Sequence, residues 1–522
     1  MLTWSPPRLA LICASGLAGA AAVLGWAPFD LVPLAIVAYA VLFMLLQLSA
    51  GGLAGFSTGA AFGLGLHAAG HGWMYSTLHT KVGLGTGLAT LSTAIYLGYL
   101  ALFTAVPCAV MGIVTKQLAE RGAGRSGWHM ALAFAAVLTL GEWLRSTLFN
   151  GFTPLSIGYV TLDTWLAGFV PVGGMYLGGF VALLLASLLG GVALARGRSA
   201  FRMAVVASLL TAGWALSLVE WSQPVGPSLS YRLVQANVIQ ARKFDPFHAT
   251  QYARHITDLI LQAPADIIAT PETAYTTFLN QLPGDTLGRL LQFSQRTTSH
   301  VFLGIATAAA NSDGYNSVLQ ITPDGGRDNL ARYDKMRLMP FGEYSPAGFG
   351  WFTNSLSIPM KDMSAGRDDQ EPLVLAKRGA AVKIGTLICQ EELVGRYGIR
   401  WAESAHLVLN PTNLSWFDNS LAIDQRLQIV RMRSLEIARP FLRVANTGIT
   451  AQIDPRGSVV ARLPPQVEGV LSGVVQPTTG LTPFARVGDG LALLLCGMGL
   501  LPTAWRMTRR HHPAHPAATP GR

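Results

Sequence analysis

The uneven placement of charge along the chain is the feature that most constrains its fold. Residues 1 to about 220 and about 487 to 505 are almost free of charged side chains, whereas residues 222–484 have an ordinary soluble composition. Only 13% of the 522 residues are charged, about half of what a soluble protein usually carries. Apolar runs of ~20 residues are long enough to cross the hydrocarbon core of a bilayer. The sequence therefore predicts a membrane protein with one large water-facing domain.

Hydropathy predicts eight membrane spans. They are expected near residues 9–26, 31–49, 52–68, 83–112, 129–148, 165–195, 203–219 and 487–505. The first span is expected to be an uncleaved anchor rather than a signal peptide, because further spans follow at once. The predicted division of the chain is a seven-span bundle, a soluble domain, a last span and a tail, over residues 1–221, 222–484, 485–506 and 507–522 respectively.

Basic residues between the spans predict the orientation. They cluster before the first span, after the fourth, after the sixth and after the eighth, near Arg8, Arg121, Arg198 and Arg509. An eight-span count places all four clusters on one side, which the positive-inside rule assigns to the cytoplasm. The domain over 222–484 is therefore expected to be extracytoplasmic. These loops and the tail also explain the formal net charge of +10, so no nucleic-acid partner is expected.

Within the soluble region, β-branched apolar runs alternate with helical patterns. Strands are indicated by YRLVQANV, ADIIAT and VKIGTLI, which begin at residues 231, 265 and 382. Helices are expected over 247–263, 285–298, 391–404 and 420–438. Such alternation, followed by hairpins, predicts an α/β sandwich built around sheets. The predicted fold class is thus α/β, with an eight-helix transmembrane bundle attached.

Three polar residues follow predicted strands or hairpins: Glu272, Lys335 and Cys389. Cys389 alone among the four cysteines lies outside the apolar spans, which excludes a disulfide framework. A thiolate attacks a carbonyl carbon, a nearby ammonium lowers the thiol pKa, and a carboxylate can accept and return the proton. Together these residues predict acyl transfer through a thioester. Taken singly, each has a plainer interpretation: a helix cap, a surface lysine and a buried core cysteine.

Longer motifs around these residues carry a family resemblance. The runs YDKMRLMPFGEYSP from Tyr333, PETA at 271–274 and ICQEE at 388–392 resemble the nitrilase or carbon–nitrogen hydrolase superfamily, and beyond it the bacterial apolipoprotein N-acyltransferase family. The resemblance implies eight spans around a periplasmic, nitrilase-like α/β/β/α sandwich in the inner membrane. It implies that Cys389 is the nucleophile, Glu272 the base and Lys335 the oxyanion partner. The implied supporting residues are Glu343, Glu391 and Asn316.

The resemblance also implies an activity. An acyl chain from a phospholipid would move onto Cys389 and then onto the α-amine of the diacylglyceryl-cysteine that begins an apolipoprotein. The alternative within enzymes is a membrane-tethered amidase or nitrilase-type hydrolase, which would use the same residues with water as acceptor. A transporter or lipid-binding protein without catalysis is a third hypothesis. A monomer is expected, and no zinc-type spacing or phosphate loop indicates a metal or an organic cofactor.

Several positions are expected to meet the lipid substrate or to depart from the family pattern. The apolar segment 346–360, with Trp351 and Phe352, is expected to be a membrane-facing lid. Gln390 and Leu414 stand where the family has a tyrosine and an aspartate. The remaining candidates for substrate contact are Trp416, Phe417, Glu142 and Arg145. For Glu142 and Arg145 the alternative is an ion pair that only holds the bundle together.

Overall fold

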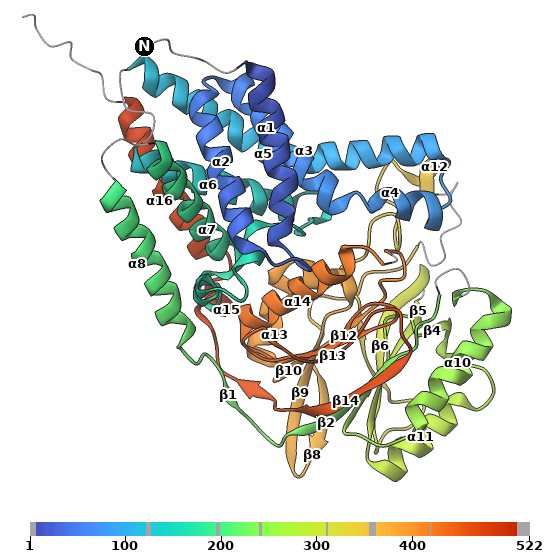
Figure 1. The fold of residues 1–522 in the computed structure, drawn as a ribbon. Helices are drawn as coiled ribbons and strands as arrows, with labels where there is room; N and C mark the ends of the chain where they lie inside the picture. Colours follow the sequence, from blue (N-terminus) through green and yellow to red (C-terminus); the bar gives the residue numbers. More distant parts are fainter. Residues whose placement is uncertain are drawn as a thin grey trace, which may run out of the picture.

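Long helices occupy the regions in which spans were predicted (Figure 1). The computed structural model describes residues 7–121, 127–194, 199–239, 243–309, 312–353, 362–417 and 419–508. The helices are α1 (Arg8–Ala22), α2 (Val32–Leu48), α3 (Gly52–His71), α5 (Thr86–Glu120), α6 (Trp128–Thr147), α7 (Val170–Leu194), α8 (Ser199–Ser217) and α16 (Gly490–Thr508).

Five segments of the described chain are long and apolar enough to cross a membrane by length and composition. They are Arg8–Gly25, Thr86–Glu120, Trp165–Leu194, Ala200–Ser217 and Gly490–Thr508. The spans predicted in α2, α3 and α6 are not among these five, and α2 is apolar but shorter, so the count of eight spans stays a prediction. Helix α5 contains most of the predicted fourth span and continues beyond residue 112 to Glu120.

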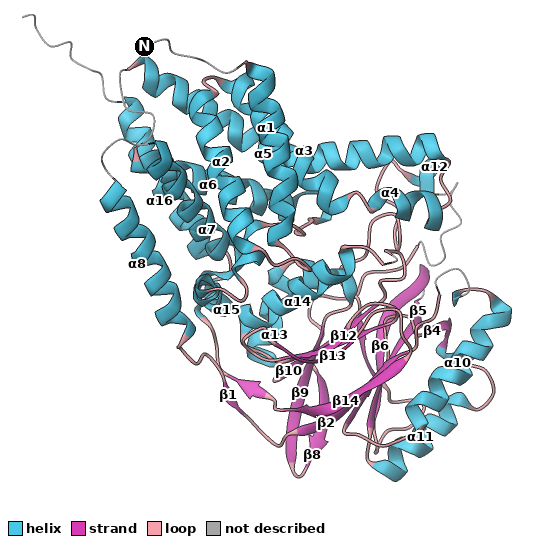
Figure 2. Ribbon diagram, in the orientation of Figure 1, coloured by secondary structure: helices cyan, strands magenta, loops and turns pink. Residues whose placement is uncertain are grey.

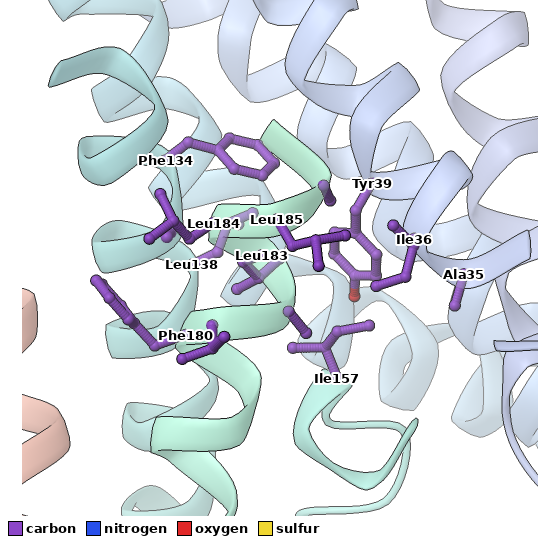
Figure 3. Packing of buried hydrophobic residues seen from close by; sticks show 14 of the residues in the cluster. Ala35, Ile36, Tyr39, Phe134, Leu138, Ile157, Phe180, Leu183, Leu184 and Leu185 are labelled. Atoms are coloured by element: carbon purple, nitrogen blue, oxygen red, sulfur yellow. The ribbon is translucent and has the colours of Figure 1, made fainter. Parts of the chain in front are cut away.

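The helices pack through small residues and a central apolar helix. Gly63 of α3 lies so close to α5 that an added Cβ would stand 2.9 Å from the Cα of Ala101. Such close approach is typical of helix pairs in membranes. Helix α7 is buried along most of its length, and Figure 3 shows its Phe180 and Leu184 packed among side chains of neighbouring helices.

Two β-sheets form the C-terminal half (Figure 2). Over the described residues, the seven-stranded sheet has the order β14 (Gly469–Val475), β2 (Leu229–Gln235), β3 (Ile267–Ala269), β5 (His300–Ala309), β6 (Ser312–Ile321) and β7 (Ala331–Asp334), with β4 (Tyr275–Phe278) paired to β5. The six-stranded sheet has the order β13 (Val459–Leu463), β12 (Thr450–Ile453), β11 (Phe441–Ala445), β10 (Leu407–Thr412), β9 (Ala380–Thr386) and β8 (Leu373–Lys377). A short pair, β1 (Gln223–Pro224) and β15 (Thr478–Thr479), lies beside them.

The sheets stack face to face and helices cover both outer sides. Apolar side chains of both sheets meet in one buried cluster, which includes Leu233 and Ile384. Helices α10 (Pro246–Leu261) and α11 (Thr286–Thr297) cover the seven-stranded sheet. Helices α13 (Gly395–Ser404) and α14 (Ala422–Ile437) pack on the other sheet. Because Ile429 and Met432 of α14 also join the core of the helical half, α14 lies between the sheets and the bundle (Figure 1).

Parallel strands place the predicted site residues at one edge of the sheets. Strands β2, β3 and β5 run parallel, and so do β9, β10 and β11. Glu272 follows β3, Cys389 follows β9, and Lys335 comes directly after β7. Carboxyl ends of parallel strands are where α/β proteins bind ligands. The helix expected over 391–404 begins only at Gly395, because Cys389–Leu393 form a separate 3₁₀ turn.

Candidate active site

Cys389 lies in a strained turn that is held by buried hydrogen bonds. Its φ angle is 45°, in the left-handed region that costs a residue with a Cβ about 1–2 kcal/mol. The Glu391 carboxylate fixes this turn: it accepts from the Ile388 N–H at 2.6 Å and from the Met336 N–H and Tyr333 O–H at 2.8 Å. Strain that is over-determined in this way is typical of active sites.

Lys335 lies between two carboxylates. Its Nζ is 2.7 Å from Oε1 of Glu272 and 2.8 Å from Oε2 of Glu343. The Asn316 amide donates to both, at 2.8 Å to Glu272 and 2.6 Å to Glu343. The other Glu272 oxygen accepts from the Asn413 N–H at 2.9 Å. The structure therefore brings four predicted residues from distant parts of the chain into one network.

Charge balance decides which of these groups are ionised. Burial would raise the pKa of the Glu272 carboxyl, but the Lys335 ammonium and the Asn316 amide hold it below its ordinary value. Burial would lower the pKa of Lys335, but the two carboxylates raise it above the ordinary value. At neutral pH Lys335 is thus an ammonium and Glu272 a carboxylate that can accept a proton.

The thiol of Cys389 is protonated at rest. Burial, and then the negative charge of Glu272, raise its pKa to about 11, while Arg426 and Lys335 act to lower it. The residue is only 7% exposed, and Glu272 is 6% exposed. A thiol of this kind becomes a nucleophile when a neighbouring base takes its proton, and Glu272 is the carboxylate whose charge acts on it most strongly.

Sequence reasoning missed several charged residues around the nucleophile. Lys243 donates to the backbone oxygen of Glu272 at 3.2 Å and to Oγ1 of Thr273 at 2.7 Å, and burial lowers its pKa to about 8. Arg426, 37 residues beyond Cys389, has its Nη2 3.5 Å from the Cys389 Sγ. Neither lies in a motif, and the sequence around each is rich in other polar and charged residues, so no local signal pointed to them.

Arg337 joins the nucleophile turn to the helical half. One guanidinium nitrogen donates to the Gln390 backbone oxygen at 3.2 Å and another to the backbone oxygen of Gly151 at 2.7 Å. The Thr153 hydroxyl likewise donates to the Leu393 oxygen at 2.7 Å. The loop that follows α6 therefore lies directly against the turn that carries the nucleophile.

Gln390 and Leu414, the two expected departures from the family pattern, have different surroundings. The Gln390 side chain is buried, and its Oε1 accepts from Nη1 of Arg426 at 3.4 Å. Leu414 is fully buried in the apolar cluster between the sheets. Gln390 thus belongs to the polar site, whereas Leu414 contributes to the core.

The remaining predicted contact residues lie toward the helical half. The Trp416 backbone oxygen accepts from the Thr77 hydroxyl at 3.1 Å, and the Phe417 ring packs at 72° to the ring of Trp73 with centroids 4.9 Å apart. Residues 354–360 of the predicted lid, and the side chains of Trp351 and Phe352 in α12 (Gly350–Thr353), lie outside the described residues.

Glu142 and Arg145 bond to the loop after α6 and not to each other in the described structure. Glu142 accepts from the Ile157 N–H at 2.9 Å, and Arg145 donates to the Ser156 hydroxyl at 2.8 Å. Arg145 also lies 3.3 Å from Nε2 of His67. The structure thus places both away from the polar network of Lys335, as links between α6 and its loop.

Two alternatives to this site can be compared with it in the described residues: a metal cluster and a surface pocket. In the described residues, no three His, Cys, Asp or Glu side chains are arranged to hold a metal ion. A pocket of about 600 Å³ lies between α11 and strands β6 and β7, lined by residues such as Phe278 and Arg332. It shares no residue with the network of Lys335, and no cysteine is among its lining residues.

Comparisons with known proteins cover both halves of the chain. Residues 232–484 match the family described as carbon-nitrogen hydrolase, and residues 18–188 match the apolipoprotein N-acyltransferase N-terminal domain. An apolipoprotein N-acyltransferase of Ralstonia nicotianae is 38% identical over 87% of this chain and 84% of its own length. Those of Nitrosomonas europaea and Bordetella bronchiseptica are 36% and 34% identical over 92% and 95% of this chain, and 95% and 97% of their own lengths.

Proposed function

The chain belongs to the apolipoprotein N-acyltransferase family of multi-pass bacterial membrane acyltransferases, and we propose that it transfers an acyl chain through a thioester on Cys389. The donor is a phospholipid, and the acceptor is the N-terminal amine of the S-diacylglyceryl-cysteine of an apolipoprotein. The observation that carries the proposal is the buried network of Glu272, Lys335 and Glu343 around a protonated thiol, set against apolar helices.

In the first half-reaction Glu272 takes the proton of the Cys389 thiol while the sulfur attacks the ester carbonyl carbon of the donor. Lys335 and the backbone N–H that follows the nucleophile stabilise the oxyanion of the tetrahedral intermediate. Collapse of the intermediate breaks the ester C–O bond. The lysophospholipid oxygen leaves with the proton that Glu272 holds, and the acyl chain remains on sulfur.

In the second half-reaction the amine of the acceptor attacks the thioester carbon. Glu272 takes a proton from the attacking nitrogen, the C–S bond breaks, and the proton returns to the sulfur. Low exposure of Cys389 supports this order, because a thioester that is screened from water survives until the amine arrives. A membrane-tethered hydrolase is the alternative, in which water takes the place of the amine.

The proposed topology follows from the same reasoning. Residues 1–221 form seven spans, 222–484 the periplasmic catalytic domain, 485–506 the eighth span and 507–522 a cytoplasmic tail, in a monomer of the inner membrane. Trp351 and Phe352 belong to a lid that meets the bilayer. The test is an alkaline-phosphatase-type reporter in the catalytic domain, and a cytoplasmic signal from it would overturn the span count.

The decisive experiment separates the thioester from the final acceptor. Full-length protein is incubated with phospholipid in detergent and its intact mass is followed; the expected result is one acyl adduct that hydroxylamine removes. Cys389→Ala is expected to show no adduct, and Cys13→Ala, the matched control at an exposed thiol, the full adduct. A hydroxylamine-labile adduct on Cys389→Ala would refute the assignment.

Adding a synthetic diacylated lipopeptide then distinguishes the two acceptors. For an acyltransferase the adduct is lost only when the peptide is present, and the peptide gains the mass of one acyl chain. For a hydrolase the adduct is lost at the same rate without peptide, and free fatty acid accumulates.

A further inference from the structure

The nucleophile has a second cation beside it that belongs to a different element from Lys335. Arg426 projects from α14, and its Nη2 lies 3.5 Å from the Cys389 Sγ. The residue is 6% exposed. Guanidinium groups keep their charge in proteins, so a positive charge is permanently present at the sulfur.

Each edge of this guanidinium is held in place. Its Nε donates to Oε1 of Glu392 at 2.5 Å, and its Nη1 lies 3.4 Å from Oε1 of Gln390. The group is planar and rigid, so two fixed edges determine the direction of the third. That third edge is the one that contacts the sulfur.

Glu392 does not neutralise Arg426 alone. Its second oxygen accepts from Arg443 at 2.7 Å, and Arg443 also donates to Asn410 at 2.6 Å. Two arginines therefore share one buried carboxylate, which leaves this trio with one net positive charge. A thiolate on Cys389 is the negative charge that would balance it.

Glu272 belongs to a second network of charges. Lys335 is shared by Glu272 and Glu343, and the buried Lys243 donates to the backbone oxygen of Glu272. When the thiol proton moves to Glu272, the negative charge moves from that network onto the sulfur, next to the positive trio. The arrangement therefore favours the charge distribution that exists during nucleophilic attack.

We infer that Arg426 is a further catalytic residue: through Nη2 it stabilises the thiolate of Cys389, and Gln390 holds it in position. The inference rests on the proposed function only in taking Cys389 as the nucleophile. The coulombic effect of Arg426 on the thiol pKa has the sign that this role requires.

The test measures the thiol without any lipid. Full-length protein in detergent is alkylated with iodoacetamide from pH 6 to 10, and the modified Cys389 peptide is quantified by mass spectrometry. Thiolate is the reacting form, so each unit by which the thiol pKa rises slows alkylation tenfold below that pKa. We expect Arg426→Gln to be at least about tenfold slower at pH 8, and Arg426→Lys to lie between it and the unmodified protein.

Two further variants keep the result interpretable. Arg431→Gln, on the same helix but bonded to Asp163 and to the Gly457 oxygen, is the matched control and should alkylate at the rate of the unmodified protein. The variant Arg443→Gln removes the other cation of the trio and leaves Arg426 paired with Glu392, so it should slow alkylation less than Arg426→Gln does. Equal slowing in the two variants would overturn the inference, because the net charge of the trio, and not the contact of Nη2 with the sulfur, would then act on the thiol.

The outcome is independent of acyl transfer. A normal thiol titration in Arg426→Gln, with an unfolding temperature close to that of the unmodified protein, would refute the role of Arg426 while the adduct experiment still decides the thioester. Conversely, if Arg426→Gln slows the alkylation of Cys389 but the unmodified protein forms no acyl adduct, the role of Arg426 is supported and the proposed function is refuted.

Discussion

Replacing Glu272 by glutamine should change two reactions of the same sulfur in opposite directions. The carboxylate raises the pKa of the Cys389 thiol by its negative charge, and in the proposed mechanism it is also the base. In Glu272→Gln the thiol pKa is expected to fall from about 11, so iodoacetamide should alkylate Cys389 faster at pH 8. Acylation by phospholipid should fall by about 10²–10⁴-fold, or about 2.7–5.5 kcal/mol of barrier, which is typical of a lost general base.

The structure also sets the stability cost of this change. Both oxygens of Glu272 face donors, Lys335 and Asn316 on one and the Asn413 N–H on the other. A glutamine supplies one acceptor oxygen only, so its NH₂ group must meet a donor in either orientation. One unsatisfied buried polar group costs about 1–3 kcal/mol, so the unfolding temperature should drop. Lys335 keeps Glu343 as a partner, so the cation stays in the site.

The assay compares the two rates in one preparation. Alkylation is measured with iodoacetamide and acylation by intact mass with phospholipid, and Asp258→Asn, which alters an exposed pair with Arg289, serves as the control. Faster alkylation with slower acylation identifies Glu272 as a base. If both rates fall together in a folded variant, the carboxylate supports the thiolate instead and the charge argument is refuted.

Three further predictions concern the buried cations. Lys335→Met should form no acyl adduct and should unfold at a lower temperature by an amount that corresponds to about 3–5 kcal/mol, because the buried carboxylate of Glu272 and the partly buried one of Glu343 lose their cation. Normal stability would contradict the pairing. Arg433→Met removes the partner of Glu436, whose pKa burial raises to about 7. A carboxyl whose pKa is raised in the folded state destabilises the protein as the pH rises through that pKa. The loss in unfolding temperature should therefore be larger at pH 8.5 than at pH 5.5. An equal loss at the two pH values would refute the pairing of Arg433 with Glu436. Arg337→Met breaks the link between the nucleophile turn and the loop after α6. The adduct should then form about tenfold more slowly, since each such hydrogen bond contributes about 1.5–3 kcal/mol. An unchanged rate would show that the link is dispensable.

Local pattern predicted most of the architecture of this protein. Charge-free runs predicted where the long helices lie, because the cost of burying charge in lipid acts on every residue of a span. Alternating strand and helix patterns predicted the strands that end near Glu272 and Cys389. The boundaries were less accurate. The helix expected from residue 391 begins at Gly395, because Cys389–Leu393 form a separate 3₁₀ turn that starts with a left-handed φ angle at Cys389.

Only the tertiary structure decided the electrostatics of the site. The motifs named Lys335 and two glutamates, but not that one ammonium is shared by both carboxylates. No motif pointed to Arg426, which reaches the sulfur from α14 across 37 residues of sequence. The pKa of a buried group depends on burial and on through-space distances to other charges, and neither quantity is local along the chain. The sequence by itself therefore determines the residue types and predicts the spans. The ionisation states that allow Cys389 to act as a nucleophile depend on which charges the fold brings together.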